Sequence, residues 1–166
     1  MIDGRVELGY RLGDDCDLTE IVEFPFPIPS GPEAEAAIRI LHLAAGVSYY
    51  KCVAPVPLDT GPLSVDEAAL VRALYDEGLR EFAYRNEITV PLPVEILGPV
   101  GPVADQPVSQ GSGALVPIGG GKDSALVAAL VPQGELFAVN PVGAHSALAA
   151  ALGRPLIGAV RTLDPQ

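Results

Sequence analysis

The sequence predicts an α/β protein in two parts, an α+β amino-terminal domain followed by a partial α/β domain with a parallel sheet. Residues 114–166 alternate short, continuously apolar runs with helical runs, which is typical of a parallel sheet covered by helices. Residues 1–97 instead combine strands of alternating hydrophobicity with helices that begin at polar residues. The intervening residues 98–113 are rich in Gly and Pro, which predicts a linker between the two domains.

In the amino-terminal domain, a hairpin and two helices are expected. Residues 6–12 alternate apolar and polar side chains, and residues 18–24 follow after a polar turn, so the two segments should pair as antiparallel strands. Each helix should begin at a capping box, in which a Ser and a Glu three residues later bond to each other's backbone. The boxes are Ser30 with Glu33 and Ser64 with Glu67. The first helix should end at Gly46 and the second near Gly78.

The carboxy-terminal part predicts three strands and two helices in alternation. The strands are residues 114–118, 136–139 and 156–160, and the helices are residues 123–130 and 144–152. This order predicts parallel pairing of the strands. If the chain is only a remnant without the part that completes this sheet, an exposed sheet edge is expected after residues 156–160, and such an edge would favour association with another chain.

Charge and composition exclude several classes of protein. The 166 residues include 10 Lys and Arg against 21 Asp and Glu, a formal net charge of −11, so the chain should repel nucleic acids and anionic membranes. The sequence has neither a signal-peptide pattern nor an apolar run long enough to span a bilayer, which predicts a cytoplasmic protein without a membrane association. Cys16 and Cys52 lack metal-ligand spacing, and we expect both to be reduced thiols.

A glycine-rich segment between the first apolar strand and helix of the carboxy-terminal part is the most informative motif. It consists of Gly119, Gly120, Gly121, Lys122, Asp123 and Ser124. Consecutive glycines permit a tight turn with exposed N–H groups, and the helix start adds partial positive charge, so the segment can bind an anion such as phosphate. It is not a nucleoside-triphosphate P-loop, because Asp123 follows the Lys, nor a dinucleotide fingerprint, because Ser124 stands where Gly is required. A structural helix entry without a ligand is the alternative.

This segment resembles the PP-loop of the ATP pyrophosphatases, which split ATP into AMP and pyrophosphate. The resemblance implies a Rossmann-like domain that binds ATP and Mg²⁺. It further implies that the three glycines and Ser124 hold the pyrophosphate group, that Lys122 neutralises developing charge, and that Asp123 lies near the metal ion. Lys122 and Asp123 are thereby the expected catalytic residues.

Residues 43–51, 77–86 and 116–118, taken with the glycine segment, look like the UDP-N-acetylmuramoyl-L-alanyl-L-glutamate epimerase family. Members adenylate the terminal L-glutamate of a UDP-linked muramyl dipeptide, invert its α-carbon through an acyl-adenylate, and release AMP and pyrophosphate. They are longer than this chain, so the resemblance implies an amino-terminal portion that associates with a missing carboxy-terminal half. The implied substrate-binding residues are Ser48, Tyr49, Tyr50, Lys51, Glu81 and Asn86. A structural role at a helix end is the alternative for Tyr49, Tyr50 and Lys51. For Glu81 and Asn86 the alternative is an Arg80–Glu81 pair on a solvated face.

Two other functions compete with epimerisation: another adenylating ATP pyrophosphatase, or a truncated nucleotide-binding remnant without activity. The general acid and base cannot be named from these residues. His145 opens a helix and could face the glycine segment, although a structural role is the simpler interpretation. Cys16 and Cys52 could act as the paired thiols of a racemase only if the fold brought them together.

Overall fold

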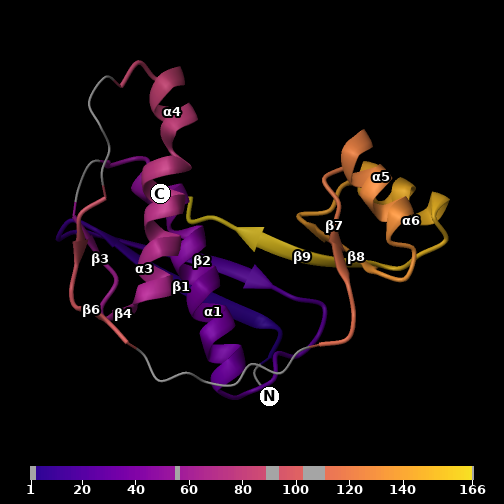
Figure 1. Ribbon diagram of the computed structural model, residues 1–166, viewed down its shortest axis with the longest axis horizontal. Coiled ribbons are helices and arrows are strands. Elements are labelled where there is room, and N and C mark those ends of the chain that lie inside the picture. The colour runs from indigo at the N-terminus through magenta and orange to yellow at the C-terminus, as the bar shows by residue number, and fades with distance from the viewer. Residues whose placement is uncertain (1–2, 55–56, 89–93, 103–110, 166) are drawn as a thin grey trace. The chain divides into compact units, whose positions relative to one another are not determined.

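The computed structural model describes residues 3–54, 57–88, 94–102 and 111–165 (Figure 1). These residues form two compact units, which we describe separately. The first unit combines the amino-terminal hairpin with the carboxy-terminal segment, and the second consists mainly of the residues between them. The mixture of helices with parallel and antiparallel strands confirms the predicted α/β class.

Parallel strands joined by helices form the carboxy-terminal segment of the first unit. In chain order the elements are β7 (Leu115–Pro117), α5 (Lys122–Leu130), β8 (Glu135–Val139), α6 (Gly143–Ala151) and β9 (Leu156–Thr162). Val116 lies opposite Leu136, which lies opposite Leu156 on the next strand. Connections of this kind are right-handed in nearly all proteins, which puts both helices on one face of the strands. Ala128 of α5 and Ala149 of α6 accordingly share one buried cluster with Leu136, and the predicted alternation is confirmed (Figure 1).

The amino-terminal hairpin adds two strands to the same sheet. β1 (Arg5–Leu12) and β2 (Cys16–Glu23) are neighbours joined by a short turn, so they run antiparallel as predicted. The sheet order is β1-β2-β9-β8-β7, and β2 pairs antiparallel with the end of β9. The expectation of an exposed edge after residues 156–160 is therefore wrong where β2 covers residues 160–162.

An ion pair supports the contact between β2 and β9. The side chain of Glu20 is 0% exposed, and its two oxygens accept hydrogen bonds from Nε and Nη2 of Arg161 at 2.5 and 2.9 Å. Burying a carboxylate is costly unless it is paired and hydrogen-bonded, so Glu20 depends on Arg161. The pairing of β2 with β9 also joins residues from the two predicted domains, 1–97 and 114–166. The division of the chain into these two domains stays a prediction.

Helices around a small apolar core form the second unit. They are α1 (Pro32–Ala45), α2 (Val47–Tyr50), α3 (Val65–Arg72), the π-helical turn η1 (Ala73–Glu77) and α4 (Arg80–Arg85). Two pairs of short parallel strands accompany them: β3 (Leu58–Asp59) with β5 (Ile96–Leu97), and β4 (Leu63–Ser64) with β6 (Val100–Gly101). β6 lies within the predicted linker 98–113, so this stretch includes a paired strand, and residues 103–110 lie outside the described part.

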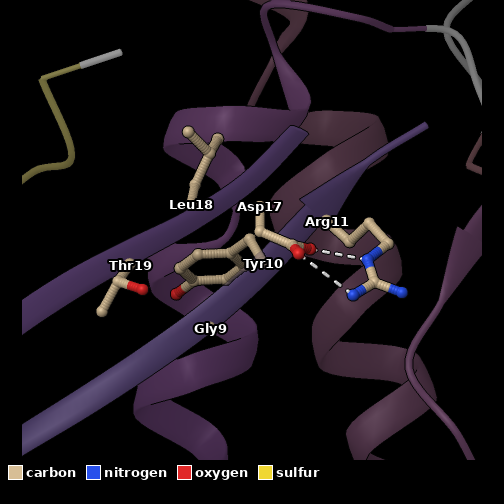
Figure 2. Close-up of a pocket in the computed structure, with 6 residues that line it drawn as sticks. All are labelled: Gly9, Tyr10, Arg11, Asp17, Leu18 and Thr19. Carbon is tan, nitrogen blue, oxygen red and sulfur yellow. Dashed lines mark hydrogen bonds and ion pairs between the residues drawn. The ribbon is translucent and has the colours of Figure 1, made fainter. Parts of the chain in front are cut away.

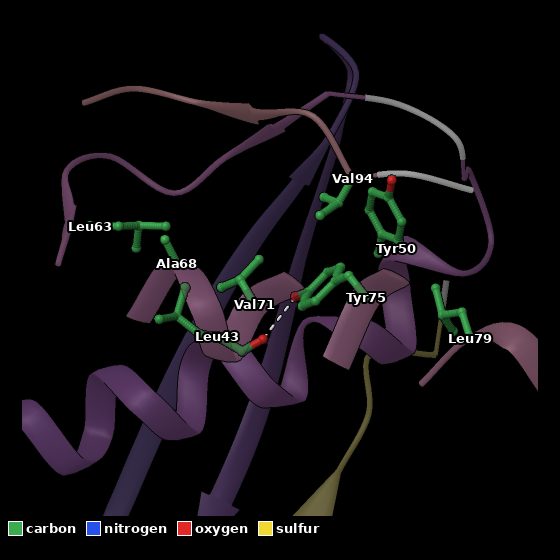
Figure 3. Close-up of a cluster of buried hydrophobic side chains, with 8 residues drawn as sticks. All are labelled: Leu43, Tyr50, Leu63, Ala68, Val71, Tyr75, Leu79 and Val94. Carbon is green, nitrogen blue, oxygen red and sulfur yellow. Dashed lines mark hydrogen bonds between the residues drawn. The ribbon is translucent and has the colours of Figure 1, made fainter. Parts of the chain in front are cut away.

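The core of the second unit surrounds two tyrosines (Figure 3). Its buried members are Leu43, Tyr50, Leu63, Ala68, Val71, Tyr75, Leu79 and Val94. The rings of Tyr50 and Tyr75 meet edge to face, with their centroids 5.0 Å apart. The hydroxyl of Tyr75 donates a 2.8 Å hydrogen bond to the carbonyl oxygen of Leu43. Burial, with a smaller contribution from Tyr50, raises the pKa of Tyr75 to about 12, so this hydroxyl stays protonated.

Of the two predicted capping boxes, one forms. The backbone N–H of Glu67 donates to Oγ of Ser64 at 3.0 Å, and the N–H of Ser64 donates back to Oε2 of Glu67 at 2.8 Å, which confirms the start of α3. The box predicted at Ser30 is wrong, because Gly31 caps α1 and makes no side-chain capping bond. Pro32 explains the difference, since proline favours the first helical position and fixes the residue before it as the cap.

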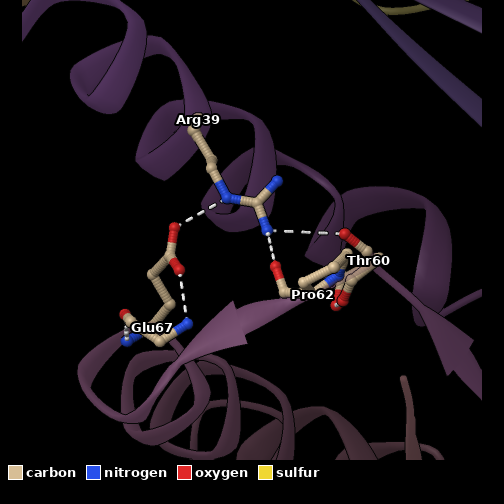
Figure 4. Close-up of polar contacts among 6 residues, drawn as sticks. Arg39, Thr60, Pro62 and Glu67 are labelled. Carbon is tan, nitrogen blue, oxygen red and sulfur yellow. Dashed lines mark hydrogen bonds and ion pairs between the residues drawn. The ribbon is translucent and has the colours of Figure 1, made fainter. Parts of the chain in front are cut away.

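Arg39 ties α1 to the start of α3 (Figure 4). Its Nε donates to Oε1 of Glu67 at 2.7 Å, and its Nη2 donates to the carbonyl oxygens of Pro62 and Thr60 at 2.6 and 3.5 Å. Partial burial alone would raise the pKa of Glu67, but the hydrogen bonds from Ser64 and Arg39 together hold that pKa below its usual range.

Candidate functional site

The glycine segment forms a turn at the carboxyl end of β7. The backbone N–H of Ile118 still bonds to Phe137 of β8 at 2.8 Å, and the chain then leaves the sheet. Gly120 has a φ of +76°, a left-handed conformation that glycine adopts without steric cost. Gly121 is extended and caps α5, which begins at Lys122. Ligands of open α/β sheets bind outside the carboxyl ends of the strands, so this glycine loop lies where such ligands bind.

The hydroxyl of Ser124 organises the glycine loop from within. Its Oγ donates to the carbonyl oxygen of Gly121 at 2.9 Å and accepts from the N–H of Gly119 at 3.3 Å. No side chain caps the N-terminus of α5. The first-turn N–H groups of a helix have no partner within it, so those of α5 can donate to an anion.

Lys122 and Asp123 stand together at the start of α5. Both are exposed, and neither has an ion-pair partner among the described residues. An ammonium group beside uncapped N–H groups favours a bound anion, and a carboxylate at the same turn can coordinate a cation that the anion brings with it. The structure thus brings together all six residues of the predicted loop.

Two further residues, Asn140 and His145, follow the carboxyl end of β8, and the sequence marks them less clearly than the glycine loop. Asn140, at the end of β8, has a φ of +48°, and its side chain accepts from the N–H of Arg161 at 2.7 Å and donates to the carbonyl oxygen of Arg161 at 2.9 Å. An Asn before Pro is a turn signal that the sequence analysis did not use. His145 is the third residue of α6, and Nδ1 of its ring accepts from the N–H of Val142 at 2.9 Å.

The predicted substrate-binding residues lie in the second unit. Ser48, Tyr49 and Tyr50 belong to α2, and Lys51 is the exposed residue at its end. Tyr49 and Tyr50 are buried at 8% and 3% exposure, so their rings pack in this unit. Substrate contact by these residues stays a prediction.

Glu81 and Asn86 lie on and just after α4. Glu81 pairs with Arg85 at 2.8 Å in an exposed i,i+4 arrangement, and the side chain of Asn86 donates to the carbonyl oxygen of Phe82. Both interactions are ordinary for a solvated helix, and the role in substrate binding stays a prediction for these residues too.

A shallow pocket of about 390 Å³ lies on the hairpin (Figure 2). It is lined by Gly9, Tyr10, Arg11, Asp17, Leu18 and Thr19. Its two charged residues neutralise each other, since Nε of Arg11 donates to Oδ1 of Asp17 at 2.6 Å and this bond lowers the pKa of the Asp17 carboxyl. This pocket offers no unpaired charge for a reaction, and the glycine loop remains the candidate site.

The described ranges contain no group of three or more His, Cys, Asp or Glu side chains that could coordinate a metal ion. Cys16 and Cys52 are both free thiols. No helix in the part of the chain that the structure describes is long and apolar enough to cross a membrane.

The parallel strands, their helices and the glycine loop define the first unit as an α/β unit with a candidate anion site at the carboxyl ends of its strands. The chain belongs to the MurL N-terminal domain family, whose model matches residues 2–166.

Three curated relatives carry the name UDP-N-acetyl-alpha-D-muramoyl-L-alanyl-L-glutamate epimerase. Those of Salinispora tropica, Micromonospora sp. and Xanthomonas oryzae pv. oryzae are 37%, 36% and 33% identical to this chain. Each alignment covers 98% of this chain, but only 39%, 40% and 39% of the respective relative. The chain therefore spans about two fifths of the length of the curated relatives it matches. No solved structure matches it.

The resemblance to the epimerase family is confirmed by these matches. The wider placement among the ATP pyrophosphatases, and the roles of the loop residues, stay predictions.

Proposed function

We propose that this chain is the amino-terminal part of an ATP-dependent UDP-N-acetyl-α-D-muramoyl-L-alanyl-L-glutamate epimerase, which acts in peptidoglycan precursor synthesis. The observation that carries the proposal is the match of nearly the whole chain to relatives of that name. The glycine loop supports the use of ATP, because it combines a left-handed glycine, an uncapped helix start and an exposed lysine.

The residues of the loop fit the pyrophosphate portion of ATP. The left-handed turn at Gly120 and the extended Gly121 bring the chain into α5 without a side chain in the way, so phosphate oxygens can approach the N–H groups. Lys122 would neutralise the charge that builds up on the departing pyrophosphate. The Ser124 hydroxyl would keep the loop in shape while the oxygens bind.

Asp123 is the proposed ligand for Mg²⁺. A single carboxylate suits this ion, because Mg²⁺ in nucleotide sites is held by one or two carboxylates together with phosphate oxygens and water. Asp123 is exposed at the same turn as Lys122, where it would meet a metal ion carried by the phosphates.

Inverting the α-carbon of glutamate requires removal of a weakly acidic proton. Proton loss next to a carboxylate would place a second negative charge on the group, so the carboxylate must first be neutralised. When bound, ATP would supply the adenylyl group that neutralises it. The contribution of this chain is to hold the phosphates and to stabilise the leaving charge through Lys122 and the loop N–H groups.

We further propose that the UDP-linked dipeptide contacts residues of α2 and α4, and that a carboxy-terminal half completes the enzyme. The short coverage of the relatives supports the second point. We also propose a cytoplasmic location, which suits an enzyme that uses ATP and a UDP-linked substrate.

A direct test uses a chimera in which this chain replaces the part of the Salinispora tropica relative that it matches. The chimera is incubated with UDP-N-acetylmuramoyl-L-alanyl-L-glutamate, ATP and Mg²⁺, and AMP release and the chirality of the glutamate are measured. We expect AMP and D-glutamate, both lost in Lys122→Ala and retained in Arg72→Ala, which removes an exposed charge from α3. A folded chimera that releases no AMP would refute the proposal.

A further inference from the structure

His145 lies against the middle glycine of the loop. A β-carbon built on Gly120 would be 3.7 Å from Nε2 of His145 and 3.5 Å from Cβ of Ala144. The start of α6 therefore packs on the glycine loop, and the Nε2 edge of the imidazole faces Gly120. A residue that follows β8 in the sequence thus borders the loop that follows β7.

The hydrogen bond at the other side of the ring fixes its proton. Nδ1 accepts from the N–H of Val142 at 2.9 Å, so in the neutral imidazole the proton sits on Nε2. Nε2 has no hydrogen-bond partner among the residues that the structure describes. His145 thus presents an N–H donor toward the loop from a ring whose orientation its own helix start maintains.

We propose that His145 is a ligand-binding residue, whose Nε2–H donates to an oxygen of the pyrophosphate group held by the glycine loop. This inference rests on the proposed function and deepens it. The donor has a clear use, because Asp123 and the net charge of −11 both oppose the binding of a polyanion. Since the ring is already held by Val142, the donor is oriented before the ligand arrives and little side-chain entropy is lost on binding.

Two substitutions separate this role from a purely structural one. His145→Asn places an amide oxygen near the position of Nδ1, so it keeps the acceptor for Val142 and removes the distal donor. His145→Gln places its amide nitrogen near the position of Nε2, so it keeps the distal donor and removes the acceptor. The proposal predicts that Asn impairs ligand binding and Gln impairs the start of α6.

The probe is inorganic pyrophosphate with Mg²⁺, and its affinity for the 166-residue chain is measured by isothermal titration calorimetry beside the melting temperature. We expect His145→Asn to bind about tenfold more weakly with an unchanged melting temperature, as for a lost hydrogen bond to a charged group. His145→Gln should bind nearly as the original chain does and melt at a lower temperature. Affinity unchanged in Asn and lost in Gln would overturn the role of His145 as a donor.

Lys122→Ala distinguishes the two proposals. If Lys122→Ala loses pyrophosphate binding while His145→Asn retains it, the glycine loop binds its ligand as proposed and the inference about His145 is wrong. If neither the original chain nor the folded chimera binds pyrophosphate, the ATP site and the role of His145 both fail.

Discussion

Replacing Arg161 with Met should destabilise the first unit severely. Glu20 is 0% exposed, and both of its carboxylate oxygens bond to the Arg161 guanidinium. Removing one partner of a buried pair typically costs about 3–5 kcal/mol, because the other charge is left buried and uncompensated. Adding Glu20→Met to Arg161→Met should recover most of the loss, since a buried pair replaced by apolar side chains of similar volume is close to neutral.

The same unit supplies a matched control. Arg11 and Asp17 form another bidentate pair, at 2.6 and 3.1 Å, but their side chains are 68% and 71% exposed. Solvent screens such a pair, so Arg11→Met should have almost no effect on stability. Urea unfolding followed by far-UV circular dichroism measures both variants, and a loss of about 4 kcal/mol lowers the midpoint by roughly 2 M at a typical slope. Equal midpoints for Arg161→Met and Arg11→Met would refute the reasoning from burial.

Four smaller perturbations follow from contacts in both units. Ser64→Ala should lower the stability of the second unit by about 1 kcal/mol in a thermal melt, because the capping box at α3 loses its side-chain acceptor. Because folding lowers the pKa of Glu67, the ionised carboxylate stabilises the folded chain above the unfolded-state pKa, and this contribution is lost as the pH falls through the folded-state pKa. Glu67→Gln removes this group and should flatten the acid limb of a pH–stability curve. The pKa of Tyr75 is raised from 10.0 to about 12, so its stabilisation is full below pH 10 and is lost as the pH rises toward 12, a dependence that should be absent in Tyr75→Phe. Asn140→Gly should keep the left-handed backbone but weaken the first unit by about 1–2 kcal/mol in urea, because both bonds to β9 are lost; no change would show that these bonds contribute nothing.

Local patterns predicted the carboxy-terminal elements well. The strands and helices there follow one another at short range, and continuous apolar runs distinguish parallel strands from half-exposed ones. The capping box at Ser64 also depends only on residues three apart, and it formed. The box at Ser30 failed for an equally local reason, because Pro32 moved the helix start by one residue.

Contacts between distant residues were not predictable in this way. Glu20 and Arg161 lie 141 positions apart, and neither has a local feature that names the other, so the union of the hairpin with β9 was missed. The glycine loop was recognised because its six residues are contiguous. The position of His145 against Gly120 depends on the packing of α6 beside the loop, so the sequence could offer it only as one of two interpretations.

The strand order limits how early the sheet can form while the chain is being synthesised. β2 leaves the ribosome well before its partner β9, so the five-stranded sheet cannot close until residues 156–162 have emerged. Until then Glu20 stays in water and the second edge of β2 is open to other chains. Pairing of strands so far apart in sequence also slows folding. A piece of this chain cut before Leu156 would keep the hairpin but could never bury Glu20.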